Sequence, residues 1–240
     1  MRVPSTEIQN NFGRYLKYAE ASEEIIITKN GKDVATLTAL REPISDSIME
    51  GAATYRTNEW VTYEEFLVLT EQSEQRYELI DGIIYNLASP TYKHQLTVQV
   101  LLVAFYNWFK GTSCTPLTSP FDVTFFKQAD NICVVQPDLL VICDRENIDQ
   151  KGKYKGTPAL VVEILSPSSR SKDLITKLDL YMRCEVKEYW IVDPMNEQIS
   201  VYTFADNDIT DFKSYHKLSH TYVESAHFEG LKVAFEDLFE

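Results

Sequence analysis

The sequence has little positive charge for its length: 23 lysine and arginine residues stand against 36 aspartate and glutamate residues, which gives a net charge of −13. A protein that binds nucleic acid over a broad surface without specificity is normally basic. The charge balance therefore argues against that class of protein. A local basic groove remains compatible with it.

Cysteine pairs and long apolar runs are also missing. The four cysteines (Cys114, Cys133, Cys143 and Cys184) form no C-x-x-C pair and have no accompanying histidine cluster, so we expect reduced thiols and neither a disulfide framework nor a zinc site. The longest apolar region, 96–109, is too short to span a bilayer, and the N-terminus lacks the apolar core of a signal peptide. We therefore predict a cytoplasmic protein without a membrane segment.

The composition of the 240-residue chain favours a folded protein. Hydrophobic residues make up 44% of it, enough for the core of one large domain or two smaller ones. Residues 41–58 contain Pro, Gly, Ser and Thr without clear periodicity and are predicted to be a linker. The linker separates a small unit, 1–40, from a large domain, 59–240.

The small unit is predicted to be a helix followed by a β-hairpin. Ser5 and Thr6 are residues that favour a helix N-terminus. Asn30 and Gly31 lie between two β-rich runs and predict a type I′ turn. Because a helix and a hairpin of this size bury little surface, we expect the unit to dimerise or to dock on the rest of the chain.

The pattern of 59–240 predicts an α/β domain with a mixed sheet flanked by helices. The expected helices are 62–72, 92–111, which reads as largely buried, and 171–184. The expected strands are a hairpin in 76–88 with an Asp81-Gly82 turn, then 121–126, 132–143 with a break at Pro137, 158–165, and an antiparallel pair at 188–194 and 198–204.

Two acidic residues occupy apolar strands of this domain. Glu163 lies inside the run LVVEIL, where an ionised carboxylate is costly unless it is paired or bound to a cation. Because side chains alternate along a strand, Glu163 and Asp138 converge if their strands are neighbours in register. Oxygen-only ligation favours Mg²⁺ or Mn²⁺, and Lys177 on the next helix could stabilise charge on a phosphate. The pattern indicates a minimal phosphodiesterase site.

Each of these three residues also has a purely structural interpretation. An aspartate after a proline, such as Asp138, is commonly a turn residue. Glu163 could form an ion pair with a nearby lysine. Lys177 could be an exposed residue of an amphipathic helix. The spacing alone does not choose between these interpretations and the catalytic one.

Six segments of the large domain occur in a characteristic order: YELIDGIIY, SPTYKH, VQPDLL, LVVEILSPSS, DLITKLDLY and EYWIVDP. Together they resemble the Uma-type restriction endonuclease family, a branch of the PD-(D/E)XK nuclease superfamily, over residues 59–240. The resemblance implies a restriction-endonuclease-like mixed sheet and a magnesium-dependent nuclease core, with Mn²⁺ as a substitute ion.

The resemblance also implies roles for individual residues. Asp138 would be the metal-binding aspartate of the PD element, and Glu163 the acidic residue of the (D/E)XK element. Leu165 stands where the motif has its lysine, and Lys177 on the following helix would replace it. Glu78 would be a further metal or water ligand, or alternatively a hairpin charge facing solvent.

The first 40 residues resemble the DNA-binding half of the Phd/YefM antitoxins, through STEIQNNFGRYL and EEIIITKNGKDVATL. That resemblance implies a dimer that binds DNA, whereas the alternative is a dimerisation or docking module. The candidate DNA-contacting residues are Arg14, Lys29 and Lys32 here, and Lys151, Lys153 and Lys155 in the loop 149–156 of the large domain. Each group could equally be an ordinary solvated surface.

The leading prediction is a magnesium-dependent endonuclease that hydrolyses DNA through a metal-activated water and acts as a homodimer. The alternative is a non-catalytic, DNA-binding transcriptional regulator with an antitoxin-like head and a degenerate nuclease core. A third possibility is a dimerisation scaffold without metal affinity. His94, in the SPTYKH segment, is either a general base or a residue that packs near a helix start.

Overall fold

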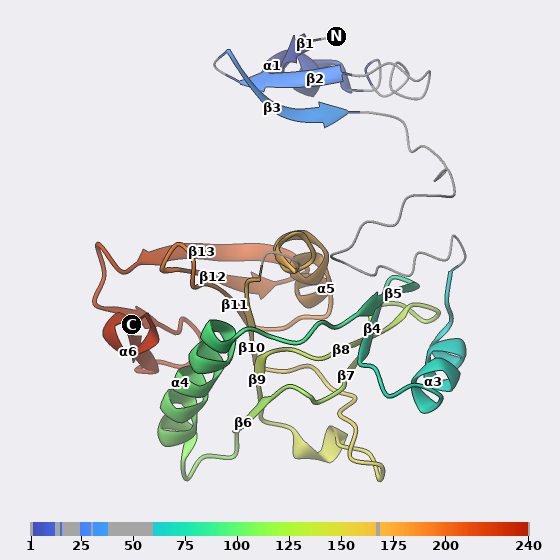
Figure 1. The fold of residues 1–240 in the computed structure, drawn as a ribbon, viewed down its shortest axis with the longest axis vertical. Coiled ribbons are helices and arrows are strands. Elements are labelled where there is room, and N and C mark those ends of the chain that lie inside the picture. Colours follow the sequence, from blue (N-terminus) through green and yellow to red (C-terminus); the bar gives the residue numbers. More distant parts are fainter. Residues whose placement is uncertain are drawn as a thin grey trace. The chain divides into compact units, whose positions relative to one another are not determined.

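The computed structural model describes residues 2–12, 15, 25–29, 31–37, 60–166 and 169–239. The chain divides into two compact units, residues 1–49 and 50–240, whose main elements are labelled in Figure 1. The predicted linker, 41–58, lies outside the described residues.

The N-terminal unit contains a three-stranded sheet and a short helix, and its predicted hairpin is confirmed. Its elements are β1 (Arg2–Pro4), α1 (Ser5–Asn10), β2 (Ile25–Lys29) and β3 (Lys32–Leu37). Strands β2 and β3 pair antiparallel, and Gly31 in their turn has φ +75°, a value that glycine adopts at low cost. Strand β1, which pairs in parallel with β2, was not predicted. The buried apolar residues are Val3, Ile8, Tyr15 and Ile25.

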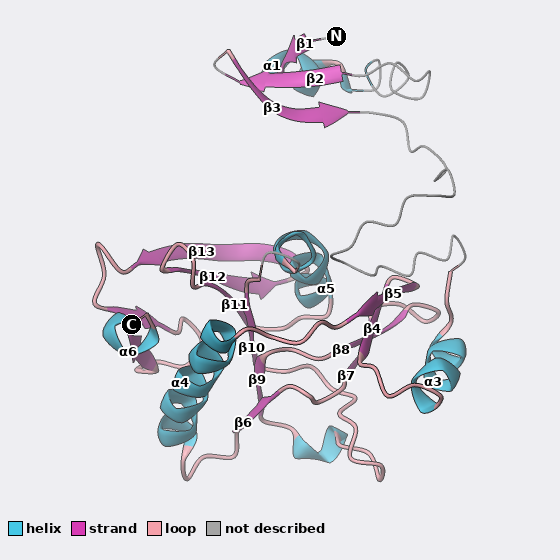
Figure 2. Ribbon diagram, in the orientation of Figure 1, coloured by secondary structure: helices cyan, strands magenta, loops and turns pink. Residues whose placement is uncertain are grey.

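The large unit is built on a six-stranded sheet (Figure 2). In spatial order its strands are β13 (Asp208–His216), β12 (Gln198–Ala205), β11 (Glu188–Asp193), β10 (Leu160–Ile164), β9 (Leu139–Ile142) and β6 (Thr115–Thr118). The β10–β11 pair is parallel and the other four pairs are antiparallel. The predicted mixed sheet and the antiparallel β11–β12 pair are therefore confirmed, whereas β6 and β13 were not predicted.

A second, four-stranded sheet holds the predicted hairpin. Its strands, in spatial order, are β5 (Ile83–Asn86), β4 (Tyr77–Ile80), β8 (Ile132–Val135) and β7 (Val123–Phe126). Asp81 and Gly82 have φ of +49° and +70°, as a type I′ turn requires. Pro137 separates β8 in this sheet from β9 in the larger one, because proline lacks the N–H that would continue the ladder. A two-stranded sheet of β14 (Tyr222–Glu224) and β15 (Lys232–Ala234) was not predicted.

Helices cover both faces of the six-stranded sheet. The helical elements are α3 (Tyr63–Glu71), α4 (Tyr92–Phe109), η1 (Arg145–Asn147), η2 (Lys172–Lys177), α5 (Leu178–Arg183) and α6 (Phe235–Leu238). Apolar side chains of α4 and α6 pack on one face. On the other face, α5 and the four-stranded sheet enclose a second core. The predicted helix 171–184 is confirmed, but its first part, η2, is a π-helical segment.

Helix α4 is less buried than its sequence indicated. Its buried residues recur at every fourth position, at Thr97, Leu101, Phe105 and Phe109, whereas Val103 and Tyr106 are 54% and 59% exposed. One stripe of a 3.6-residue helix is enough to cover the sheet, so apolar side chains on the opposite side of the helix, such as Val103 and Tyr106, face outward. No helix in the described part of the chain is long and apolar enough to cross a membrane.

The prediction of four reduced cysteines is wrong for one pair. Cys114 and Cys143 form a disulfide, while Cys133 and Cys184 are free. In the antiparallel β6–β9 pair, Thr115 lies opposite Ile142, so the two neighbouring cysteines come to adjacent positions. Because the two cysteines lie 29 positions apart in the sequence, no local pattern indicated this contact.

Candidate functional site

Asp138 and Glu163 lie next to each other at the ends of adjacent strands. Strand β9 pairs antiparallel with β10, and Leu139 lies opposite Val162. Continuing that register by one residue brings Asp138 opposite Glu163. The strand adjacency that the sequence interpretation assumed is therefore confirmed, and both side chains line the same pocket.

The Asp138 carboxylate is held by two donors. Its Oδ2 accepts a hydrogen bond from the backbone N–H of Ile164 at 2.8 Å and lies 3.1 Å from Nε2 of His94. His94 is in the first turn of α4, whose N-cap is Thr91. Burial opposes a charged imidazole, but the Asp138 carboxylate outweighs it and raises the pKa of His94. Asp138 is thus fixed by its neighbours, which argues against a simple turn residue.

Glu163 is almost fully buried, with 3% of its surface exposed. Its Oε1 accepts hydrogen bonds from Lys177 Nζ at 2.7 Å and from the Tyr181 hydroxyl at 2.6 Å. Burial, reinforced by repulsion from Asp173, Asp138 and other acids, raises the pKa of Glu163, and Lys177 acts against that rise. The ion pair with a lysine, one of the structural interpretations, is therefore present.

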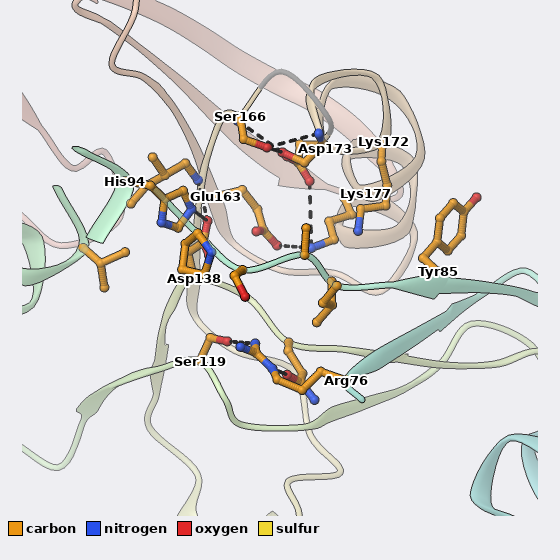
Figure 3. Close-up of a pocket in the computed structure, with 18 of the residues that line it drawn as sticks. Arg76, Tyr85, His94, Ser119, Asp138, Glu163, Ser166, Lys172, Asp173 and Lys177 are labelled. Atoms are coloured by element: carbon orange, nitrogen blue, oxygen red, sulfur yellow. Dashed lines mark hydrogen bonds and ion pairs between the residues drawn. The ribbon is translucent and has the colours of Figure 1, made fainter. Parts of the chain in front are cut away.

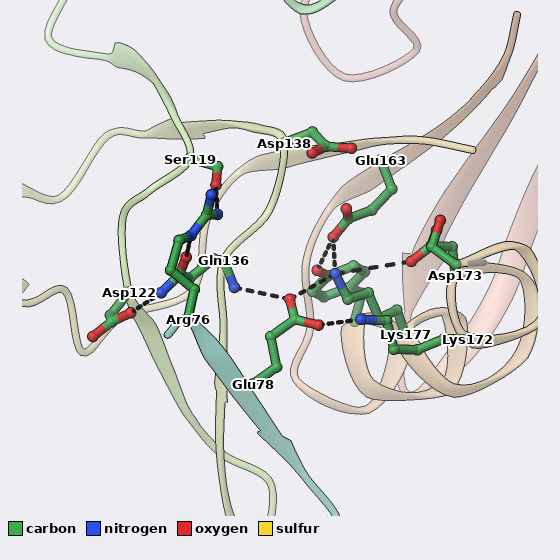
Figure 4. A network of polar contacts seen from close by, with 12 residues as sticks. Arg76, Glu78, Ser119, Asp122, Gln136, Asp138, Glu163, Lys172, Asp173 and Lys177 are labelled. Carbon is green, nitrogen blue, oxygen red and sulfur yellow. Dashed lines mark hydrogen bonds and ion pairs between the residues drawn. The ribbon is translucent and has the colours of Figure 1, made fainter. Parts of the chain in front are cut away.

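Lys177 is buried at the centre of an acidic cluster (Figure 4). Its ammonium lies 2.7 Å from Glu163, 2.8 Å from Glu78 and 3.8 Å from Asp173. Burial disfavours its charge, but these carboxylates raise the pKa of Lys177 well above its ordinary value. The interpretation of Lys177 as an exposed helix residue is wrong, because its side chain is only 3% exposed.

Glu78, on β4, is fully buried beneath the pocket. Its two oxygens contact Lys172 Nζ at 2.5 Å and Lys177 Nζ at 2.8 Å, and Oε1 also accepts the N–H of Gln136 at 3.0 Å. Burial opposes its ionisation, but the two lysines lower the pKa of Glu78 to about 2. The interpretation of Glu78 as a hairpin charge facing solvent is therefore wrong.

His94, Asp138, Glu163, Lys172 and Lys177 line an open pocket of about 880 Å³. Figure 3 shows Asp138 and Glu163 between His94 on one side and Lys177 on the other, with Arg76 and Ser119 across the pocket from the two lysines. The carboxylates of Glu78, Glu163 and Asp173 contact the ammonium groups of Lys172 and Lys177, whereas Asp138 contacts His94. Within the described residues, no three His, Cys, Asp or Glu side chains form a ready-made metal-binding group.

The lysines predicted to contact DNA are not among the residues that line this pocket. No residue of the loop 149–156 lines the pocket; Lys153 pairs with Asp122 and Lys155 with Asp149, each at 3.2 Å. Lys29 and Lys32 face each other across the β2–β3 turn of the N-terminal unit. Arg14 lies outside the described residues.

Several residues of the site were not assigned to it from the sequence. Asp173 and Tyr181 are four residues before and after Lys177, and this i±4 spacing on one helical face could have indicated a shared partner. Arg76 and Gln136 had no local signal, because they meet across 60 positions of sequence.

Comparison with known proteins identifies both parts of the chain. Residues 63–236 match the model of the Uma2 family, described as "Putative restriction endonuclease". Residues 1–53 match the model of the Phd_YefM antitoxins of type II toxin-antitoxin systems.

Two individual proteins are similar to much of the chain. The uncharacterized protein slr1290 of Synechocystis sp. is 29% identical over 146 residues, which is 60% of this chain and 74% of that protein. The crystal structure of a putative nuclease belonging to DUF820 from Anabaena variabilis matches with a TM-score of 0.59 at 23% identity, covering 75% of this chain and 97% of the other. This likeness supports the predicted mixed α/β fold. With its model matching 63–236, the chain belongs to the Uma2 family and carries a Phd/YefM antitoxin domain at its N-terminus.

Proposed function

We propose that the chain is a magnesium-dependent endonuclease that hydrolyses phosphodiester bonds of DNA. The observation that carries the proposal is the position of Asp138 directly opposite Glu163. Asp138 immediately precedes β9 and Glu163 lies in the neighbouring strand β10, and both side chains line one open pocket. Membership of the Uma2 family supports a nuclease activity in the same domain.

The donor set of the pocket fits a hard divalent cation. Asp138 and Glu163 supply carboxylate oxygens only, which Mg²⁺ and Mn²⁺ prefer. Mg²⁺ is commonly held by one or two carboxylates, with waters and substrate phosphates completing its shell, so a third protein ligand is not needed. When bound, the ion would lower the pKa of a coordinated water and offset negative charge on the phosphate.

The surrounding residues hold the two carboxylates in place. The Ile164 N–H and His94 both engage Oδ2 of Asp138, which leaves Oδ1 available to the pocket. Lys177 and Tyr181 both engage Oε1 of Glu163. We therefore assign Lys177 to orienting Glu163 and balancing its charge, because an ammonium group with carboxylates on three sides has little freedom to reach a substrate.

We further propose that the Phd/YefM domain places the nuclease on DNA as a homodimer, and that the protein acts in the cytoplasm. The family match over residues 1–53 supports the DNA-binding part of this proposal. Arg14, Lys29 and Lys32 are its candidate phosphate contacts, and a loss of DNA affinity on replacing them together by glutamine would support it.

Cleavage of supercoiled plasmid tests the nuclease. The parent protein should cut with Mg²⁺ or Mn²⁺ and stop with EDTA, and Asp138→Asn and Glu163→Gln should each lose cutting by at least a hundredfold. Asp211→Asn, on the exposed strand β13, removes the same charge outside the pocket and should cut like the parent. If the two pocket variants cut as fast as the parent, the site is assigned wrongly.

A non-catalytic DNA-binding regulator is the second candidate. It is favoured by Leu165, which replaces the lysine of the (D/E)XK element, and by the antitoxin domain. A gel shift of the full-length protein on the DNA upstream of its own coding sequence separates the two candidates. Tight binding with no cutting under any divalent cation would favour the regulator.

A further inference from the structure

Arg76 differs from the other cationic residues that line the pocket. Lys172 contacts Glu78, Lys177 contacts Glu78 and Glu163, and His94 contacts Asp138. Within the described part of the chain, Arg76 forms no ion pair with a carboxylate. Its Nε donates to Gln136 Oε1 at 2.8 Å, and one terminal nitrogen donates to Ser119 Oγ. Its neutral partners leave the guanidinium charge uncompensated.

The partners of Arg76 attach it to the chain segment that carries Asp138. Gln136 precedes Asp138 by two residues, and the Ser119 N–H donates to the Asp138 carbonyl oxygen at 3.4 Å. The Gln136 amide nitrogen donates to Asp122 Oδ1 at 2.8 Å, which turns the amide oxygen toward Arg76 (Figure 4). The guanidinium is therefore held in a fixed place by Gln136 and Ser119, and it lines the same pocket as Asp138.

A guanidinium held in this way is suited to a phosphate. Arginine has five N–H donors in a planar fork, of which two are occupied by Gln136 and Ser119. The fork matches two oxygens of one phosphate group. An arginine that is paired with a carboxylate must break that pair before it can bind a phosphate. Arg76 has neutral partners and does not need to break such a pair.

The charge of the pocket points the same way. The lysines contact carboxylates, Lys172 that of Glu78 and Lys177 those of Glu78 and Glu163, and His94 contacts Asp138, whereas both partners of Arg76 are neutral. A divalent cation at Asp138 and Glu163 would add positive charge to the same pocket. Because Lys172 and Lys177 are engaged with carboxylates, Arg76 is the pocket cation available to an anionic substrate.

We propose that Arg76 binds a backbone phosphate of DNA next to the Asp138–Glu163 pair and so positions the phosphodiester in the pocket. This inference rests on the proposed nuclease function and names a substrate-binding residue for the same site. The contact is to a phosphate and not to a base, so it contributes affinity and register without sequence preference.

Binding measured without cutting tests this residue. Full-length Glu163→Gln protein is titrated with a fluorescent DNA duplex in Mg²⁺ at several salt concentrations. Adding Arg76→Gln should weaken DNA binding roughly tenfold or more, as loss of a charged hydrogen bond does. It should also reduce the salt slope, which is the slope of log affinity against log salt concentration, by about one in magnitude. Arg76→Lys should keep the slope and lose only part of the affinity. Arg145→Gln is the matched control: Arg145 also donates to a hydroxyl, that of Thr115, but lies outside the pocket.

A methylphosphonate scan identifies the contact itself. One phosphate of the duplex at a time is replaced by a neutral methylphosphonate, and the DNA affinity is measured. At one position the replacement should lower the affinity of the Glu163→Gln protein but leave the affinity of the Arg76 variants unchanged. Arg76→Lys serves for this comparison if Arg76→Gln does not fold. Equal affinity and equal salt slope for all Arg76 variants, or identical methylphosphonate profiles, would overturn the inference.

The outcomes also separate this inference from the proposed function. If the parent protein neither cuts nor binds DNA, the nuclease proposal fails and the role of Arg76 fails with it. If the parent cuts and binds while the Arg76 variants behave like the Arg145→Gln control, only the role of Arg76 is wrong.

Discussion

Lys177 and Glu163 form a buried ion pair, with 2.7 Å between Nζ and Oε1. The lysine lies at the end of η2 and the glutamate in β10, 14 positions apart. Glu78 and Asp173 approach the same ammonium group. Removing a buried cation leaves carboxylates without compensation, so this lysine couples the stability of the domain to the geometry of its pocket.

Lys177→Met should destabilise the protein by about 3–5 kcal/mol, the usual cost of removing one partner from a buried ion pair. Urea unfolding followed by tryptophan fluorescence measures the change. Lys172→Met is the matched control and should cost less, because the Lys172 side chain is 14% exposed against 3% for Lys177. Equal losses for the two variants would contradict a central role for Lys177.

Glu78 should make the free energy of unfolding depend on pH below pH 4.5. Its pKa is lowered to about 2 from an ordinary value of 4.5, so its carboxylate stabilises the folded state above pH 4.5. That contribution, about 3 kcal/mol, should be lost as the pH falls from 4.5 toward 2. The difference in unfolding free energy between parent and Glu78→Gln should therefore shrink over this range. A difference that stays constant between pH 7 and pH 3 would show that the Glu78 pKa is not lowered.

His94→Ala should weaken metal binding about 10- to 100-fold, as loss of a residue that orients a metal ligand commonly does. The reason is its contact with Asp138 Oδ2, which fixes the carboxylate. Mn²⁺ titration calorimetry measures the affinity directly. His94→Gln retains a side-chain donor and should recover part of it. If alanine and glutamine give the same affinity as the parent, His94 does not position Asp138.

Reduction of the Cys114–Cys143 disulfide should destabilise the protein by about 3–4 kcal/mol, the loop-closure contribution for a separation of 29 residues. Thiol titration of the unfolded protein should find two free thiols before reduction and four after it. Cys133→Ser, which leaves the bond intact, is the control. Four thiols in the unreduced protein would show that the bond does not form.

The sequence by itself was sufficient for several local elements and for singling out two acids, Asp138 and Glu163. The continuous apolar run LVVEIL predicted β10, the Asp81-Gly82 pair predicted the β4–β5 turn, and Pro137 predicted a break. Glu163 could be singled out because a charge inside an apolar strand needs a partner. These inferences succeed because backbone periodicity and turn geometry depend on residues close together in the chain.

The tertiary structure alone decided which side chains meet. It placed Lys177 among three carboxylates, buried Glu78, brought Arg76 to Gln136 and Ser119, and joined Cys114 to Cys143. It also kept the lysines of the loop 149–156 out of the pocket. Such contacts depend on the order and register of strands far apart in sequence, and a shift of one residue would turn each side chain to the opposite face of its sheet.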